Sequence, residues 1–241
     1  MNQPLPQSAP GNYEDMVKAG MHFGRKKTVF HPNMKPFVYG TREDIHLIDL
    51  IKTGESLASA TAFMKQFLLD SKMILFVGVT KQSENAIKSL AEALNMPYVI
   101  ERWLGGTLTN YKVIISRVRY LEDLEKQQRS GELDKYTKKE RLLKEREIEL
   151  LRQKYDGLRK LTRVPDAVFV TSLKESMLAI KEAKTVKIKT IGIVNTDSDP
   201  RLLDFPIPAN DNARRSIELI CQTIKETLGD VTPTVSAVTE K

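Results

Sequence analysis

The sequence predicts a doubly wound α/β/α sandwich with a mainly parallel sheet, into which an antiparallel coiled-coil helical hairpin is inserted. Three observations support this fold class. Strand-like and helix-like runs alternate along most of the 241 residues, an order typical of a parallel sheet with helices on both faces. The runs 73–77 and 167–170 are continuously apolar, as in strands covered on both sides. A charge-dense helical segment, residues 107–163, interrupts the alternation.

The elements of the sandwich follow from this alternation. Short apolar runs bounded by turn residues predict strands, and longer runs with apolar positions three and four residues apart predict helices. The predicted strands are 36–39, 45–49, 73–79, 98–101, 167–171 and 190–195, and the predicted helices are 49–69, 83–95, 174–186 and 210–228.

The inserted segment divides into two helical arms, residues 107–128 and 137–161, separated by a break that contains Gly131. Thr137 followed by Glu140 forms a capping-box pattern at the start of the second arm. Each arm carries one narrow apolar stripe, which is typical of a coiled-coil seam, so we expect the arms to pack together and project from the sheet. The stripes consist of Tyr111, Ile114, Val118 and Leu121, and of Ile148, Leu151, Tyr155 and Leu158.

The ends of the chain differ from its middle. Residues 1–11 and 230–241 have no apolar periodicity and predict disordered tails. The α/β domain then comprises residues 12–106 and 164–229, with the hairpin at 107–163. The N-terminus lacks the apolar run of a signal peptide, and no stretch reaches the roughly 18 apolar residues of a spanning helix. The single cysteine, Cys221, excludes an internal disulfide. We expect a soluble, cytoplasmic protein with no membrane association.

Positive charge is concentrated in the hairpin. The chain carries 38 Lys and Arg against 31 Asp and Glu, a net charge of +7. Residues 107–163 contain 16 basic and 10 acidic side chains, so 16 − 10 = +6 of this charge lies there. Such a balance favours a polyanion such as nucleic acid, although a basic cytosolic enzyme is the alternative that charge alone leaves open.

Residues 101–110 are the most informative stretch. The only tryptophan, Trp103, follows Arg102, and a glycine pair then leads into Thr107-Leu-Thr-Asn110 at the start of the hairpin. A glycine turn that opens a helix presents free backbone N–H groups, which favours a bound anion.

A second basic stretch covers residues 22–39. Arg25, Lys26, Lys27 and Lys35 alternate there with aromatic residues. Basic loops of this kind neutralise phosphates, and the aromatic side chains stack on bases or anchor the loop to the sheet.

Catalytic and metal-binding patterns are weak. The turn after the strand at 73–79 contains Gly78 but lacks the further glycines of a nucleotide-binding turn. Lys81 in this turn contacts a phosphate of a polymer or is simply solvated at the start of the next helix. Asp197 and Asp199 follow another strand and suit either Mg²⁺ or an ordinary turn, of which the turn is preferred. The three histidines and Cys221 show no metal-ligand spacing. We expect His46 and Cys221 to be packed in the core.

Six motifs, in this order and spacing, resemble the bacterial small-subunit ribosomal protein S2 family. The resemblance covers about residues 12–228. The motifs start at Ala19 (AGMHFG), Pro32 (PNMKPF), Arg102 (RWLGGTLTN), Leu133 (LDKYTKKE), Pro165 (PDAVFV) and Asn195 (NTDSDP). Four features depart from the family pattern. Arg25 replaces a common histidine, Phe30-His-Pro32 stands where a tryptophan or other aromatic residue commonly precedes Asn-Pro, Asn195 replaces a frequent aspartate, and the tail from Asp230 is short.

The resemblance implies a flavodoxin-like domain and a structural, non-enzymatic role in translation. It implies binding to small-subunit ribosomal RNA at the junction of head and body, contact with neighbouring ribosomal proteins and docking of the large mRNA-binding protein of the subunit. No cofactor, metal or small-molecule substrate is expected. A phosphatase-like enzyme using Asp197, and a hairpin that only docks a protein helix, are the alternatives. The expected RNA-binding residues are His22, Arg25, Lys26, Lys27, Lys35, Lys81, Arg102, Trp103, Thr107, Thr109, Asn110, Lys112, Arg117 and Arg119.

Overall fold

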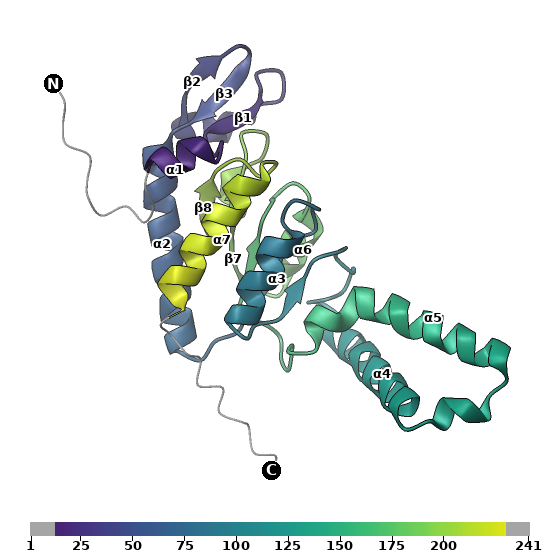
Figure 1. Cartoon of the computed structure of the whole chain (residues 1–241). Helices are drawn as coiled ribbons and strands as arrows, with labels where there is room; N and C mark the ends of the chain where they lie inside the picture. Colours follow the sequence, from purple (N-terminus) through teal and green to yellow (C-terminus); the bar gives the residue numbers. More distant parts are fainter. Residues whose placement is uncertain (1–12, 230–241) are drawn as a thin grey trace.

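The computed structural model describes residues 13–229, so the two predicted tails, 1–11 and 230–241, lie outside the described residues. The described chain forms a central sheet with helices on both faces, a small N-terminal sheet, and a pair of helices that projects to one side (Figure 1).

The central sheet contains five parallel strands. They are β4 (Ile74–Val77), β5 (Tyr98–Val99), β6 (Ala167–Val170), β7 (Lys189–Val194) and β8 (Phe205–Pro208). Their spatial order is β5-β4-β6-β7-β8, and every neighbouring pair is parallel. Numbered along the chain this is the order 2-1-3-4-5 of the flavodoxin-like doubly wound sheet. The predicted fold class of the α/β domain is confirmed.

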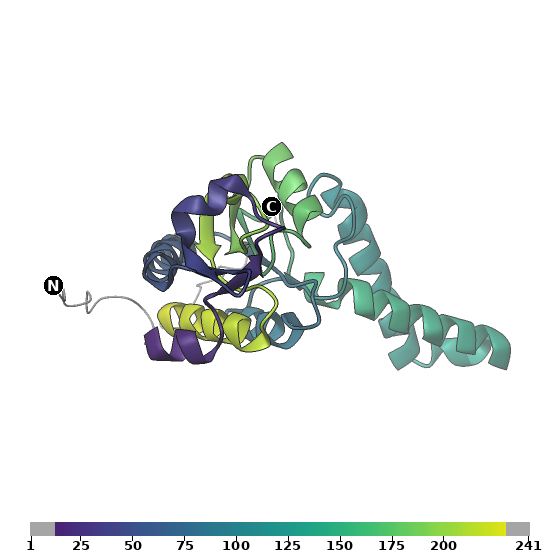
Figure 2. The ribbon, with the colours of Figure 1, turned by 90° about the horizontal axis from the view of Figure 1, so that it is seen from above.

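Two apolar layers hold the helices against this sheet, because successive strand side chains point to opposite faces. Phe76 and Phe169 face α2 (Leu50–Leu69), α3 (Glu84–Ala93) and α7 (Arg214–Leu228). Their neighbours Val77 and Val170 face α6 (Met177–Thr185) and the start of the projecting helices. Figure 2 shows α7 (yellow) and α6 (light green) on opposite sides of the strands. Cys221 lies in the first layer, as expected.

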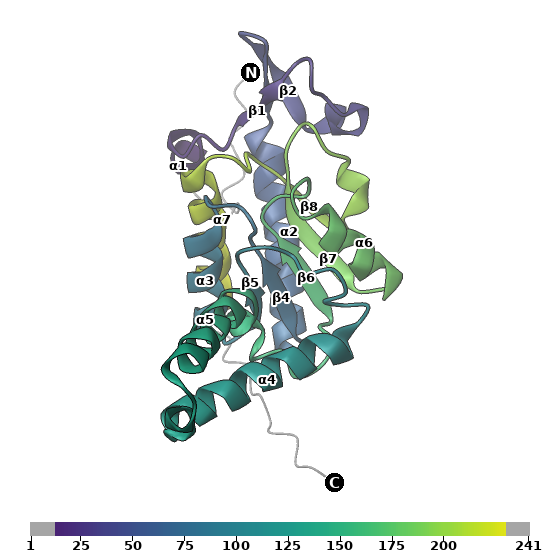
Figure 3. The same cartoon turned by 90° about the vertical axis from the view of Figure 1, so that its right-hand side faces the viewer.

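An N-terminal module, residues 13–48, lies over the carboxyl ends of the central strands (Figures 1 and 3). The Asn210 N–H donates to the Met21 carbonyl and the His31 N–H donates to the Thr196 carbonyl, which attaches the module to the loops after β8 and β7. The module consists of α1 (Tyr13–Lys18), β1 (Phe23–Lys26), the 3-10 helix η1 (Pro32–Phe37), β2 (Val38–Arg42) and β3 (Ile45–Ile48), with antiparallel strand order β1-β3-β2.

Proline explains two errors in the predicted elements. The strand predicted at 36–39 begins only at Val38, because Pro32 and Pro36 belong to the 3-10 helix η1. Strand β8, Phe-Pro-Ile-Pro, was not predicted, because proline removes a donor from the hydrogen-bond ladder. It is tolerated here because β8 is an edge strand.

The inserted segment forms α4 (Tyr111–Arg129), η2 (Glu132–Lys135), α5 (Lys138–Tyr155) and η3 (Asp156–Leu158). The helices α4 and α5 lie side by side in opposite directions (Figures 1 and 3) around Leu121, Leu124 and Ile148. The capping box at Thr137 is confirmed. The first arm begins four residues later than predicted and the second ends before Leu161, while coiled-coil packing of the pair stays a prediction.

Candidate nucleic-acid interface

The anion site predicted before α4 is filled by a carboxylate of the chain itself. Glu182 on α6 is only 7 % exposed. Its Oε1 accepts hydrogen bonds from the Trp103 indole at 3.0 Å and the Gly106 N–H at 2.8 Å. Its Oε2 accepts from the Leu108 N–H at 3.0 Å and from the N–H and hydroxyl of Thr109 at 3.4 Å. We call residues 103–109 with Glu182 the Glu182 cradle.

The cradle keeps Glu182 ionised. Burial alone would raise the pKa of this carboxyl, but the hydrogen bonds from Trp103, Gly106, Leu108 and Thr109 together outweigh burial and lower the pKa. Trp103 and Thr107 are 6 % and 1 % exposed, and the Thr107 hydroxyl donates to the Leu104 carbonyl. Trp103 and Thr107 are therefore buried in the cradle and fix the start of α4, whereas Thr109 at its edge is exposed.

Arg25 also forms internal ion pairs, and its side chain is 25 % exposed. Its Nη2 donates to Asp211 Oδ1 at 3.1 Å, and its Nε lies 3.5 Å from Asp197 Oδ2. Both carboxylates are buried, and Asp211 also accepts hydrogen bonds from Ser172 and Asn195. The guanidinium thus occupies the carboxyl edge of the sheet, where doubly wound folds often hold a ligand. This differs from the direct phosphate contact predicted for Arg25.

The structure favours the turn interpretation of residues 195–200. Asp199 caps the 3-10 helix η4 (Pro200–Leu202) by accepting from the Arg201 N–H, and Asp197 pairs with Arg25 and Lys174. Within residues 13–229, no group of three His, Cys, Asp or Glu side chains is placed to hold a metal ion. His46 is packed, as predicted, with its ring 4.4 Å from that of Phe30.

His22 is half-buried. Its ring lies 4.1 Å from that of Phe23, and burial lowers the pKa of the imidazole. At physiological pH it is therefore largely neutral and offers little positive charge to a phosphate.

The remaining predicted cations are accessible. All eight are exposed, and none forms a salt bridge with another described residue. The set is Lys26, Lys27, Lys35, Lys81, Arg102, Lys112, Arg117 and Arg119. Thr109 and Asn110, at the start of α4, are exposed as well.

Seven of these cations form two groups at different ends of the molecule. The first group is the three lysines of the N-terminal module, residues 26, 27 and 35. The second group comprises Arg102, which precedes α4, and Lys112, Arg117 and Arg119 in the first half of that helix. Figure 3 shows α4 apart from the N-terminal module. Lys81 follows β4 and belongs to neither group.

Two members of the second group line a groove of about 560 Å³ between α4 and residues 159–162. Lys112 and Arg119 line it, together with the apolar side chains of Tyr111 and Ile115. The lining of the groove therefore combines cations with apolar side chains, and it also includes the acid Glu122.

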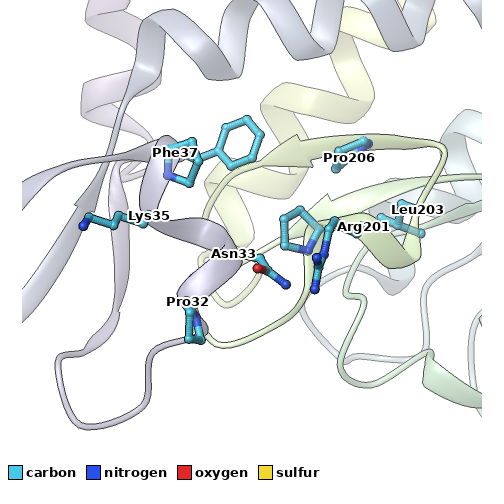
Figure 4. Close-up of a pocket in the computed structure, with 9 residues that line it drawn as sticks. Pro32, Asn33, Lys35, Phe37, Arg201, Leu203 and Pro206 are labelled. Carbon is cyan, nitrogen blue, oxygen red and sulfur yellow. The ribbon is translucent and has the colours of Figure 1, made fainter.

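Lys35 lies at the rim of a mostly apolar hollow of about 670 Å³ between η1 and β8. In Figure 4 its side chain extends away from Arg201 and Pro206, while Phe37 points toward Pro206. The lysine is therefore free to contact a partner beside the hollow. The hollow is lined by Pro32, Asn33, Lys35, Pro36, Phe37, Pro200, Arg201, Leu203 and Pro206.

Glu125 joins the two projecting helices to the body. It is 5 % exposed on α4 and accepts hydrogen bonds from Arg152 on α5 and from both terminal nitrogens of Arg159, each at 2.9 Å. The Arg159 bonds lower the pKa of Glu125, burial opposes them, and the Arg152 bond lowers it further, to about 2. Arg152 and Arg159 are therefore already paired, and together with Glu125 they form the stem of the hairpin, where α4 and α5 join the body.

Sequence reasoning did not identify Glu182, Asp211 or Glu125. Glu182 had a visible signal, because it falls on the apolar stripe of its helix with Ala179, Ala183 and Val186, three and four residues apart. A lone acid on a buried stripe requires internal donors. Asp211 lies in a turn and Glu125 among many charges, so neither had such a signal.

Comparison with known proteins agrees with the motifs. The profile of the family described as "Ribosomal protein S2" matches residues 16–230. Proteins named "Small ribosomal subunit protein uS2" are similar over most of this chain. The protein from Helicobacter hepaticus is 39 % identical over 89 % of this chain and 81 % of its own length. The one from Chlorobium chlorochromatii is 41 % identical, over 89 % and 86 % of the two chains.

The matched region includes both the α/β domain and the projecting helices, so the similarity is not restricted to one part of the fold. A relative from Mycoplasmopsis synoviae is 41 % identical, and its similarity likewise covers 89 % of this chain and 73 % of its own length. On this evidence the chain belongs to the ribosomal protein S2 family.

Proposed function

We propose that this chain is a structural component of the small ribosomal subunit that binds ribosomal RNA through its unpaired surface cations. Members of the family serve translation as structural proteins and are not enzymes. The observation that carries the proposal is the division among the basic residues. Internal carboxylates pair with Arg25, Arg152 and Arg159. The eight accessible cations named above are exposed and form no ion pair within the described region.

Unpaired cations on a rigid surface suit a phosphate backbone. Each neutralised phosphate releases counterions, so affinity falls with rising salt concentration. Backbone contacts of this kind position a protein without reading sequence. The proposal puts the RNA against the N-terminal module and the start of α4, at the junction of head and body of the subunit.

The test measures binding to small-subunit ribosomal RNA as a function of salt. The triple variant Lys26→Gln/Lys27→Gln/Lys35→Gln is expected to bind more weakly and to reduce the salt slope by roughly 0.7–0.9 for each phosphate that is no longer neutralised. The control is Lys65→Gln/Lys181→Gln/Lys184→Gln, which removes the same charge from other exposed positions. Equal slopes for the two triples would contradict the proposal.

The second part of the proposal is that the chain helps dock the large mRNA-binding protein of the subunit. The apolar hollow between η1 and β8 supports it, since contiguous apolar surface is typical of protein contacts. Pro36→Glu would introduce a charge on this exposed wall. We expect weaker copurification of that protein with unchanged RNA affinity, and unchanged copurification would count against the hollow.

No membrane role is part of the proposal. Among the helices of residues 13–229, none has the length and apolar content needed to cross a bilayer.

A further inference from the structure

A cleft of about 440 Å³ lies between the edge strand β5 and the C-terminal end of α5. It is separate from the groove that holds Lys112 and Arg119, because the two have no lining residue in common. Its lining comes from α3, from β5 and the chain that follows it, from the end of α5 and from η3. The residues are Lys88, Tyr98, Val99, Ile100, Glu101, Arg102, Arg152, Gln153, Lys154, Asp156 and Gly157.

The walls of this cleft are fixed by close packing. Gly157 touches Tyr98 so closely that a Cβ added to it would lie 2.6 Å from Tyr98 Cδ2 and would also meet the Tyr98 carbonyl. Two charged lining residues are already paired, Arg152 with Glu125 and Asp156 with Arg159. The shape of the cleft therefore exists before any ligand arrives.

Three further cations converge on the cleft from separate segments. Lys88 comes from α3, Arg102 from the chain after β5, and Lys154 from the last turn of α5. All three are exposed and form no salt bridge within residues 13–229. Against them stands one uncompensated acid, Glu101, which leaves a net excess of two positive charges.

We propose that this cleft binds a phosphate of the ribosomal RNA backbone, so that RNA contacts the α5 side of the hairpin base as well as the α4 side. The inference rests on the proposed function. Ammonium and guanidinium groups that line one cleft are the donors that phosphate oxygens accept best, and Gln153 adds a neutral amide. Cations on both sides of the base, in the cleft and in the Lys112 groove, suit a chain of regularly spaced charges better than one acidic protein segment.

The double variant Lys88→Gln/Lys154→Gln tests the inference, because both side chains are exposed and neither belongs to the core. Its affinity for small-subunit RNA is expected to fall roughly fivefold at about 0.15 M salt for each phosphate that is no longer neutralised, with a shallower salt slope. The control is Lys65→Gln/Lys181→Gln. Affinity and slope equal to this control would overturn the inference.

Two further measurements sharpen the result. Glu101→Gln removes the opposing acid and is expected to tighten RNA binding, and weaker binding would count against the cleft.

RNA should also protect Lys88 and Lys154 from an amine-acylating reagent. Protection by other small-subunit proteins and not by RNA would assign the cleft to a protein, and equal protection by free nucleoside monophosphate would assign it to a mononucleotide; either outcome overturns the inference.

The outcomes separate this inference from the function on which it rests. If the Lys26, Lys27 and Lys35 variant loses affinity while the Lys88 and Lys154 variant matches its control, only the cleft is wrong. If both match their controls, the RNA-binding proposal fails with it.

Discussion

Glu182 shows how a buried charge is stabilised by dipoles alone. Its carboxylate has five hydrogen-bond donors from a single turn, residues 103–109, and none of them is a charged group. In a buried environment an ionised carboxylate without partners is very costly, so the turn and the carboxylate depend on each other. The start of α4 is thereby attached to α6.

Glu182→Gln is expected to destabilise the protein by about 1–3 kcal/mol, because one amide nitrogen would face N–H groups that have lost their acceptor. The measurement is urea unfolding at pH 7. Since the pKa of Glu182 is lowered on folding, its contribution is complete above the ordinary value of 4.5 and is lost as the pH falls through the folded-state value. The variant should therefore lose less stability on acidification than the parent, and equal losses would contradict the assignment.

Gly157 packs too closely against Tyr98 to admit a side chain. Gly157→Ala would push a methyl group into Tyr98, and we expect a loss of about 1–3 kcal/mol, as in overpacked cores. Gly40→Ala is the matched control, because a Cβ at Gly40 meets nothing within 4 Å. Thermal unfolding compares the two, and an equally small effect of both changes would argue against close packing at Gly157.

At the scale of secondary-structure elements, the stem of the hairpin depends on one acid among many. Most charged residues of α4 and α5 are solvent-exposed, and exposed ion pairs contribute little to stability. Glu125 differs because it is buried and hydrogen-bonded by arginines from two other segments. Removing one partner of such a pair leaves buried charge uncompensated.

Glu125→Gln is expected to loosen the contact between α4 and α5 while the central sheet persists. Hydrogen exchange of the α4 and α5 amides should accelerate, and exchange in β4 and β6 should stay slow. Because the folded-state pKa of Glu125 is about 2, its contribution in the parent is present above pH 4.5 and disappears as the pH falls toward 2. The variant should lack this acid-dependent loosening. Faster exchange throughout the sheet would mean that the hairpin is not an independent unit.

The central elements were predictable and the peripheral ones were not, for physical reasons. Strands β4 and β6 are buried on both faces, which leaves continuous apolar runs in the sequence. Strand β8 contains two prolines, which are unfavourable in a strand pattern, and the short edge strand β1 contains basic residues in place of an apolar run. Of the candidate site, the exposed lysines could be found from composition, whereas the partners of Arg25 could not, since Asp211 is 186 residues away in sequence.

At the scale of the whole molecule, two opposite ends of the chain meet at the carboxyl edge of the sheet. Arg25, near the N-terminus, pairs with Asp211, which precedes the last helix. Backbone bonds from His31 to Thr196 and from Asn210 to Met21 reinforce the junction. The N-terminal module is therefore part of the same cooperative structure as the sheet.

Arg25→Gln is expected to cost about 3–5 kcal/mol, as for other buried pairs deprived of one charge. The variant should also weaken RNA binding only through stability. At a salt concentration and temperature where it is folded, its salt slope is expected to equal that of the parent, because Arg25 is already paired with Asp197 and Asp211. Calorimetric unfolding and RNA titration provide the two readouts. A reduced slope with unchanged stability would show that Arg25 contacts RNA directly.

The junction has a consequence for how the protein is made. The ribosome synthesises the chain from its N-terminus, and segments generally fold as their partners become available. Residues 13–48 leave the exit tunnel well before the groups that they bind, and Asp211 follows Arg25 by 186 residues. Residues 13–48 must therefore remain without these contacts until the chain as far as Asp211 has emerged.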